Sequence, residues 1–395
     1  MNEIFASIEF QMSLLLFVAL AGYLLAARIH QSAVIGEILV GIVIGPSLLG
    51  WITYTDFVES IAHLGAVILL FVIGLEFKLH DIFDKKYIVI GLAGVIIPWV
   101  AGYYLALAFG FPFAGSVFIG TALTATSIAI TANVLKEMGK LQTPVAKAII
   151  GTAVIDDVLG LLALAVSIDL VEGSISLIAT LLIVGKAVAF LAIGILLGSK
   201  LISPTIKKID QTKFAKRYPE FIFIFAMMVA FFYAMGAELI GISAIVGSFI
   251  AGVSLHGIGL QQSMHYKEGA EYLHIIFASI FFVSLGILAD FSAITLNILW
   301  FLLALTGVAV VTKVVGCGIP AKLQGMSWKD SVILGFGMSP RGEVAMIVAL
   351  IGLNAALIGQ DVFVTIVLMS LLTTIITPLV LRNWFFQKPK TIPSF

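Results

Sequence analysis

Long apolar stretches, separated by short polar segments, run along almost the whole chain. A lipid bilayer requires about 20 consecutive apolar residues from each helix that crosses it. Applied along the sequence, this length predicts thirteen membrane-spanning helices and an all-α integral membrane protein. The helices are expected at 8–27, 33–50, 59–77, 87–110, 114–135, 144–168, 174–199, 219–236, 238–255, 273–290, 292–316, 328–353 and 360–382.

Basic residues in the polar segments support this count independently. They gather in the loops after odd-numbered helices, above all at 200–217, and are almost absent from the loops after even-numbered helices. A missed or invented helix would disturb this alternation. Because cytoplasmic loops are enriched in Lys and Arg, the pattern predicts a protein of the cell membrane with its N-terminus outside and its C-terminus in the cytoplasm.

The composition points to the same class of protein. The chain has 395 residues, of which 61% are hydrophobic and only 11% are charged. Soluble domains carry about twice that share of charge, so much of this apolar surface must face lipid. The formal net charge is zero, which gives no reason to expect a nucleic-acid partner. Cys317 is the single cysteine, which excludes an intrachain disulfide and a zinc site built from several thiolates.

Short stretches of the first half recur in the second half at a nearly constant offset. The matching stretches are 36–48 with 241–255, 70–77 with 281–291, and 120–124 with 335–339. The first six predicted helices, within 8–168, would then repeat as the last six, within 219–382, with 174–199 as a linker helix. Because seven helices separate equivalent positions, the repeats would run in opposite senses across the membrane. Inverted repeats of this kind are typical of secondary transporters.

Two adjacent carboxylates, Asp156 and Asp157, lie at the centre of the sixth predicted helix. One charge at mid-bilayer costs about 2.5–3.5 kcal/mol, and a second beside it adds repulsion. Asn or Ser would join helices at lower cost, so we interpret the pair as groups that hold either a cation or a proton. Lys313 leans back toward the midplane from the eleventh helix and is expected to pair with one aspartate. The alternative is a lysine that reaches the cytoplasmic headgroups.

Polar and small residues cluster near mid-bilayer in the fifth and twelfth predicted helices. The clusters lie at 121–127 and 335–343, and the second contains Pro340. Such residues weaken the helical hydrogen-bond ladder, and freed oxygens are suitable ligands for Na⁺. Ordinary packing through small residues is the alternative. Arg341 and Glu343 either pair with each other or reach separate helices, and their spacing of two favours separate partners.

These features resemble the monovalent cation:proton antiporter-2 branch of the cation/proton antiporter superfamily. The similar stretches are 36–50, 69–77, the Asp156–Asp157 pair, Lys313 and 341–343. The resemblance covers nearly the whole chain, and the paired aspartates with the later lysine are its most specific element. It implies a homodimer in which each chain has a six-helix core domain beside a dimerisation domain. It also implies that the fifth and twelfth helices are broken and cross beside the aspartates.

The same resemblance implies roles for single residues. Asp157 would be the main ion-binding carboxylate, and Asp156 would be the partner of Lys313. Members with both aspartates are generally electrogenic sodium/proton antiporters. Potassium-efflux members often append a soluble nucleotide-binding domain, which this chain is expected to lack. The candidate ligands or structural charges at the crossing are Thr124, Thr126, Ser127, Ser339, Arg341 and Glu343.

We therefore expect 1–395 to form one transmembrane transporter, not an enzyme, that exchanges Na⁺ for H⁺ by alternating access, with Li⁺ as a second candidate substrate. One aspartate would bind either ion but not both, and this competition couples the two fluxes. No cofactor is expected beyond the transported Na⁺ and H⁺. The alternatives are a K⁺/H⁺ antiporter of the same fold, an organic-anion symporter, an intramembrane enzyme that uses the two aspartates, and a passive channel.

Overall fold

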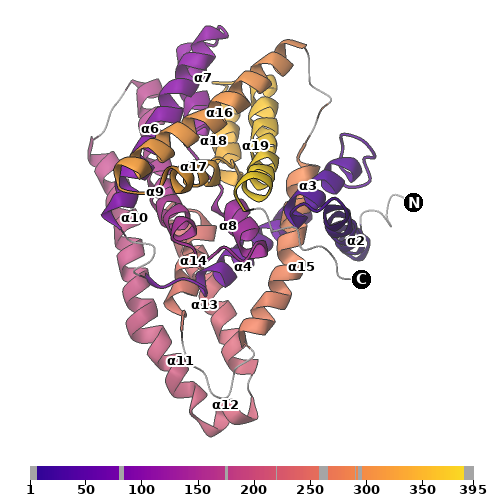
Figure 1. Ribbon diagram of the computed structural model, residues 1–395, viewed down its shortest axis with the longest axis vertical. Helices are drawn as coiled ribbons and strands as arrows, with labels where there is room; N and C mark the ends of the chain where they lie inside the picture. Colours follow the sequence, from indigo (N-terminus) through magenta and orange to yellow (C-terminus); the bar gives the residue numbers. More distant parts are fainter. Residues whose placement is uncertain are drawn as a thin grey trace.

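The computed structural model describes residues 7–79, 84–173, 177–218, 220–257, 266–289, 291 and 296–386. Every secondary-structure element in these ranges is a helix, and the helices pack into one bundle from which the α11–α12 turn protrudes (Figure 1). The first half contains α2 (Ile8–Arg28), α3 (Ala33–Ile44), α4 (Asp56–Gly74), α6 (Lys85–Ala108), α7 (Phe113–Ala122), α8 (Ile128–Glu137) and α9 (Pro144–Glu172).

The second half begins with a long helical connection and continues with the remaining helices. The connection consists of α10 (Leu177–Leu197), the π-helical turn η1 (Gly198–Ile202), α11 (Ser203–Asp210) and α12 (Lys213–Arg217). It is followed by α13 (Glu220–Leu239), α14 (Ala244–Ser254), α15 (Tyr266–Ile287), α16 (Leu296–Leu323), α17 (Trp328–Gly337), α18 (Glu343–Asn354), α19 (Gln360–Val380) and η2 (Leu381–Phe385).

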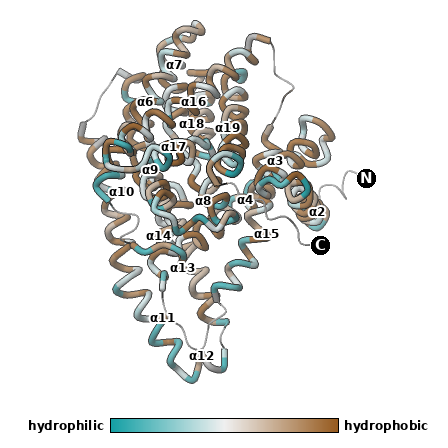
Figure 2. Tube along the Cα trace, in the orientation of Figure 1, coloured by the Kyte–Doolittle hydropathy of each residue, from teal (hydrophilic) through white to brown (hydrophobic). Residues whose placement is uncertain are grey.

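The outer surface of the bundle is apolar. Large hydrophobic side chains point outward from several helices, among them Ile224 and Phe232 on α13, each 64% exposed. Within the described ranges, nine helices are long and apolar enough to cross a membrane, and α3, α7, α14 and α18 are shorter apolar helices. Hydrophobic residues dominate the helices along most of the bundle (Figure 2). The chain is therefore an all-helical multi-pass membrane protein.

Each predicted span coincides with helix in the described residues, but several boundaries differ. The span predicted at 33–50 ends at Ile44, because Pro46 cannot continue a helix. The span predicted from 238 begins at Ala244, after Gly241 adopts a left-handed conformation with φ +88°. The spans predicted at 114–135 and 328–353 each form two helices. Residues 174–176, 219, 290 and 292–295, which belong to predicted segments, lie outside the described residues.

The centre of the bundle is formed where the broken helices meet α9. Helix α9 packs against α6, α7, α8 and α17, and α6 also packs along α16. On the other side, α4 packs against both α14 and α15, and α3 packs against α15. Figure 1 shows α8, α9 and α17 close together in the middle of the molecule. The paired aspartates of α9 therefore lie among helices from both halves of the chain.

Candidate functional site

The interruptions of the two broken helices lie against each other. The first occupies 123–127, between α7 and α8, and the second occupies 338–342, between α17 and α18. The backbone N–H of Ser127 donates to the carbonyl of Pro340 at 2.8 Å, and the hydroxyl of Thr131 donates to the carbonyl of Gly337 at 2.6 Å. The first break thus donates to the second, and Thr131 of α8 joins the end of α17 beside them, which gives partners to buried non-helical backbone.

Arg341 binds the carbonyl oxygens that surround this crossing. Its side chain is fully buried, and its guanidinium donates to the carbonyls of Ala125 at 2.9 Å, Ala309 at 3.1 Å and Met338 at 3.4 Å. Its backbone N–H donates to the hydroxyl of Thr373 on α19. Arg341 therefore connects both breaks to α16 and α19. It does not pair with Glu343, so the two charges have separate partners, as their spacing favours.

Asp156 forms a buried ion pair with Lys313. The Lys313 Nζ lies 2.8 Å from Asp156 Oδ1, and the two side chains are 0% and 1% exposed. The second oxygen of Asp156, Oδ2, has no hydrogen-bond partner. Gly94 on α6 gives room to Cys317 beside the pair, because a Cβ at that position would lie 2.5 Å from Cys317 Sγ. The alternative of a lysine that reaches the headgroups is wrong for Lys313.

Asp157 faces a different environment from its neighbour. It lines a cavity of about 20 Å³ together with Thr126, Ser127, Ser243 and Glu343. The hydroxyl of Ser243 donates to Glu343 Oε1 at 2.8 Å, and Asp157 Oδ2 is buried without a hydrogen-bond partner. A cavity of this size holds about one water molecule or an ion of similar size. The site therefore combines two carboxyls and three hydroxyls around a space for one small species.

Not all of the candidate residues face this cavity. The hydroxyl of Thr124 donates to the carbonyl of Thr121 at 2.8 Å, and that of Ser339 donates to the carbonyl of Gly335 at 2.9 Å. Both side chains are buried and neither lines the cavity, so they satisfy their own helix ends. Ser243, in contrast, lines the cavity but was not among the candidates. In the sequence, a serine just before a helix indicates only an N-cap. Its hydroxyl does act as one, because it also accepts from the N–H of Ile245.

Known proteins share both the sequence and the fold of this chain. The profile of the transmembrane sodium/hydrogen exchanger family matches residues 14–387. The Na(+)/H(+)-K(+) antiporter GerN of Bacillus cereus is 36% identical over 387 residues, which cover 98% of each chain. The Na(+)/H(+) antiporter of Enterococcus hirae is 32% identical over 381 residues, which cover 95% of this chain and 97% of the relative.

A solved structure is also similar. The sodium proton antiporter MjNhaP1 from Methanocaldococcus jannaschii at pH 8 superposes with a TM-score of 0.71. The match covers 95% of each chain at 17% sequence identity. Likeness at this identity establishes a shared helical fold.

Proposed function

Because the chain belongs to the transmembrane sodium/hydrogen exchanger family, it is a membrane cation/proton antiporter and not an enzyme, and we propose that it exchanges Na⁺ for H⁺. The observation that carries this proposal is the position of Asp157. One of its carboxyl oxygens is buried without a partner, and it faces a cavity whose polar lining consists of oxygen ligands. Oxygen atoms of carboxylates and hydroxyls are the ligands that hard cations prefer.

The hydroxyls of the cavity are oriented to receive a cation. Thr126 gives its hydrogen to the carbonyl of Met338, and Ser243 gives its hydrogen to Glu343, so both oxygens keep lone pairs for a ligand. Asp157 and Glu343 face the same small space. Two negative charges that face one small space repel each other in a medium of low dielectric constant, and either a cation or a proton reduces the repulsion. Occupancy by Na⁺ and occupancy by H⁺ therefore exclude each other.

This competition couples the two fluxes. When either ion is bound, the site carries less net charge. The bundle that holds the site therefore moves through the low-dielectric interior of the membrane more easily than when the site is empty. The Oδ2 atom of Asp156 has no hydrogen-bond partner, so Asp156 can turn toward a bound cation. Lys313 would then lose its partner and release a proton. Two protons per Na⁺ would make the exchange electrogenic. Movement would follow alternating access, in which one bundle shifts against the other around the site.

The helices support thirteen spans arranged as two inverted repeats. In the described part of the chain, nine long helices, the short α3 and α14, and the two broken pairs α7–α8 and α17–α18 together account for this number. We propose that 8–168 and 219–382 are the repeats and that 174–199 is the linker. The N-terminus would then lie outside and the C-terminus in the cytoplasm. A homodimer with a six-helix core in each chain remains the expectation from the family.

Two helix crossings within the bundle favour this symmetry. Gly41 of α3 meets Gly286 of α15, and Gly74 of α4 meets Gly252 of α14. A Cβ added to any of the four would collide with a carbonyl oxygen of the opposite helix. Each first-half glycine is separated from its second-half counterpart by about the offset of the sequence repeat, with Gly41 matching Gly252 and Gly74 matching Gly286. Equivalent positions of the two repeats thus form equivalent contacts.

The central test replaces Asp157. Wild-type protein in proteoliposomes is expected to dissipate an imposed pH gradient when Na⁺ is added, and Asp157→Asn is expected to abolish this exchange because the site loses its charge. The measurement is the recovery of a pH-sensitive dye inside the vesicles. Asp169→Asn, which removes an equal charge from the same helix, is the matched control and should retain exchange. Unchanged exchange by a folded Asp157→Asn protein would refute the assignment.

Potassium is a second candidate cargo, because one relative is named a Na(+)/H(+)-K(+) antiporter. A space for one water-sized species admits K⁺ as well as Na⁺ and Li⁺, so transport decides between them. The same vesicles would be challenged separately with Na⁺, Li⁺ and K⁺. A response to K⁺ as large as that to Na⁺ at equal concentration would favour the potassium alternative.

A further inference from the structure

A second and larger hollow lies away from the aspartates, where the α10–α11 connection meets the ends of α4 and α14. Its volume is about 460 Å³, within the range of small-molecule sites. It shares no lining residue with the cavity of Asp157. The polar residues that line it are Lys78, Ser199, Ser203, Lys207, Ser254 and His256.

The hollow is electropositive. Among the described residues that line it, the charged ones are two exposed lysines, Lys78 from the chain after α4 and Lys207 from α11, and none is Asp or Glu. Lys200 and Lys208 lie on η1 and α11 beside it in the sequence. Asp210, the acid at the end of α11, is only 1% exposed. The charge of the hollow therefore favours an anion.

The wall of the hollow is held by internal hydrogen bonds. Ser203 donates to the carbonyl of Ser254, which joins α11 to α14, and the ring of His256 is held by the carbonyl of Leu75 at 2.7 Å. Gly198 permits this close approach, because a Cβ there would collide with the hydroxyl of Ser254. Since the serine hydroxyls of Ser203 and Ser254 donate to backbone carbonyls, the lysine ammonium groups are the strong donors at the hollow.

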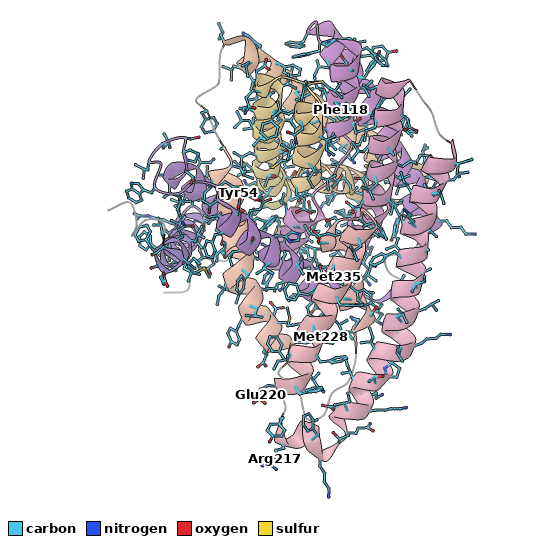
Figure 3. All side chains as sticks on the ribbon, turned by 180° about the vertical axis from the view of Figure 1, so that it is seen from behind. Tyr54, Phe118, Arg217, Glu220, Met228 and Met235 are labelled. Atoms are coloured by element: carbon cyan, nitrogen blue, oxygen red, sulfur yellow. The ribbon has the colours of Figure 1, made fainter. Side chains whose placement is uncertain are left out.

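The hollow opens beside a surface that faces lipid. The outward side chains of α10 and η1 are apolar and exposed, at 55% for Ile193, 52% for Leu196 and 59% for Leu201. Figure 2 shows that apolar residues along α10 give way to hydrophilic ones at α11 and α12. In Figure 3 the turn marked by Arg217 and Glu220 forms the end of the molecule beyond this level. The lysines thus lie where apolar surface changes to basic surface, which is the level of lipid headgroups.

We propose that this hollow binds the phosphate of an anionic lipid headgroup. Lys78 and Lys207 contact the phosphate, and the acyl chains lie along the apolar outer face of α10. Basic pockets between transmembrane helices bind anionic headgroups through such contacts. The bound lipid would join the linker to the ends of α4 and α14. This assignment is independent of the cation at Asp157.

The test measures binding of phosphatidylglycerol to the purified full-length protein by native mass spectrometry. Phosphatidylglycerol is expected to bind in preference to phosphatidylcholine. Lys78→Gln/Lys207→Gln is expected to weaken phosphatidylglycerol binding by about 25-fold, since each lysine near a membrane surface contributes about fivefold. Lys213→Gln/Lys329→Gln, with the same change in net charge at exposed positions elsewhere, should bind as the wild type does.

A second variant tests the hollow without changing charge. Ser199→Trp narrows the space and is expected to produce a similar loss of binding. Equal binding of phosphatidylglycerol to the wild type and to the double lysine variant would overturn the proposal. If inorganic phosphate alone raised the unfolding temperature of the wild type as much as the lipid did, and the lipid added nothing, the lipid assignment would fail in favour of a soluble phosphate.

Discussion

At the scale of the residue, two identical neighbours have different environments. Asp156 is sealed in an ion pair with Lys313, whereas Asp157 faces the small cavity. A helix turns by about 100° from one residue to the next, so adjacent side chains point to different neighbours. One aspartate can therefore hold a lysine while the other remains available to an ion.

The ion pair gives a prediction about stability. Asp156→Asn leaves the ammonium of Lys313 buried without its counter-charge, and breaking a buried pair in this way costs about 3–5 kcal/mol. We expect the single variant to unfold in detergent at a clearly lower temperature than the wild type. Asp156→Asn/Lys313→Met removes both charges and should recover most of the loss. The double variant should also exchange ions without sensitivity to membrane voltage.

Two results would contradict this prediction. A single variant as stable as the wild type would show that the charge of Lys313 is not isolated by the loss of Asp156. A double variant whose exchange still depends on voltage would contradict a role of the pair in carrying the second proton.

At the scale of the element, the broken helices depend on Arg341. Five residues interrupt each helix, and some of their carbonyls accept from outside the helical ladder, such as that of Pro340, which accepts from the N–H of Ser127. A guanidinium has five N–H donors in a fixed planar arrangement, which allows one side chain to bind carbonyls of Ala125, Ala309 and Met338. Arg341 therefore adds to the direct hydrogen bonds between the breaks, which Thr126 and Ser127 donate.

We expect Arg341→Gln to destabilise the protein more than Arg341→Lys does. Each buried carbonyl left without a donor costs about 1–3 kcal/mol, and glutamine reaches fewer of them, whereas lysine keeps the charge but not the planar geometry. Thermal unfolding of the purified variants measures the effect. Arg28→Gln, at an exposed position in the last turn of α2, is the control and should unfold as the wild type does. Equal stability of all three variants would contradict this role of Arg341.

At the scale of the whole molecule, glycines set the distance between helices of the two halves. The Gly41–Gly286 and Gly74–Gly252 crossings bring the backbones of paired helices into direct contact. In a membrane, helix association depends on close packing of small residues, because lipid is as apolar as the helices themselves. The two crossings therefore hold α3, α4, α14 and α15 as one unit beside the broken helices.

The two crossings should respond alike to substitution. Gly74→Ala and Gly286→Ala force the helices apart, and overpacking of this kind typically costs about 1–3 kcal/mol. Gly160→Ala and Gly307→Ala are the controls, because an added Cβ at these positions meets no atom within 4 Å. The controls should be neutral or slightly stabilising, since alanine favours a helix. Loss of stability at only one crossing would count against their equivalence in two repeats.

The sequence by itself determined the helices. The length of each apolar run and the alternation of basic loops are local properties, so they located the helical spans, whereas the two interruptions were expected from polar clusters and from the family resemblance. Pro340 with its neighbouring glycines indicated the second break, and the depth of Asp156 and Asp157 indicated their burial. A Lys313 that reaches the headgroups stayed open until the structure placed it against Asp156. Boundaries such as Ile44 and Ala244 were less certain, because caps and turns depend on a few residues.

Only the tertiary structure decided how these elements meet. Sequence reasoning did not separate Thr126, which faces the cavity, from Thr124, which binds its own helix end, because both are threonines of one short segment. It also missed Ser243, since a serine before a helix reads as an ordinary cap. The physical reason is that a site is made by side chains from distant helices, and the rotation and approach of packed helices set which oxygens share one space.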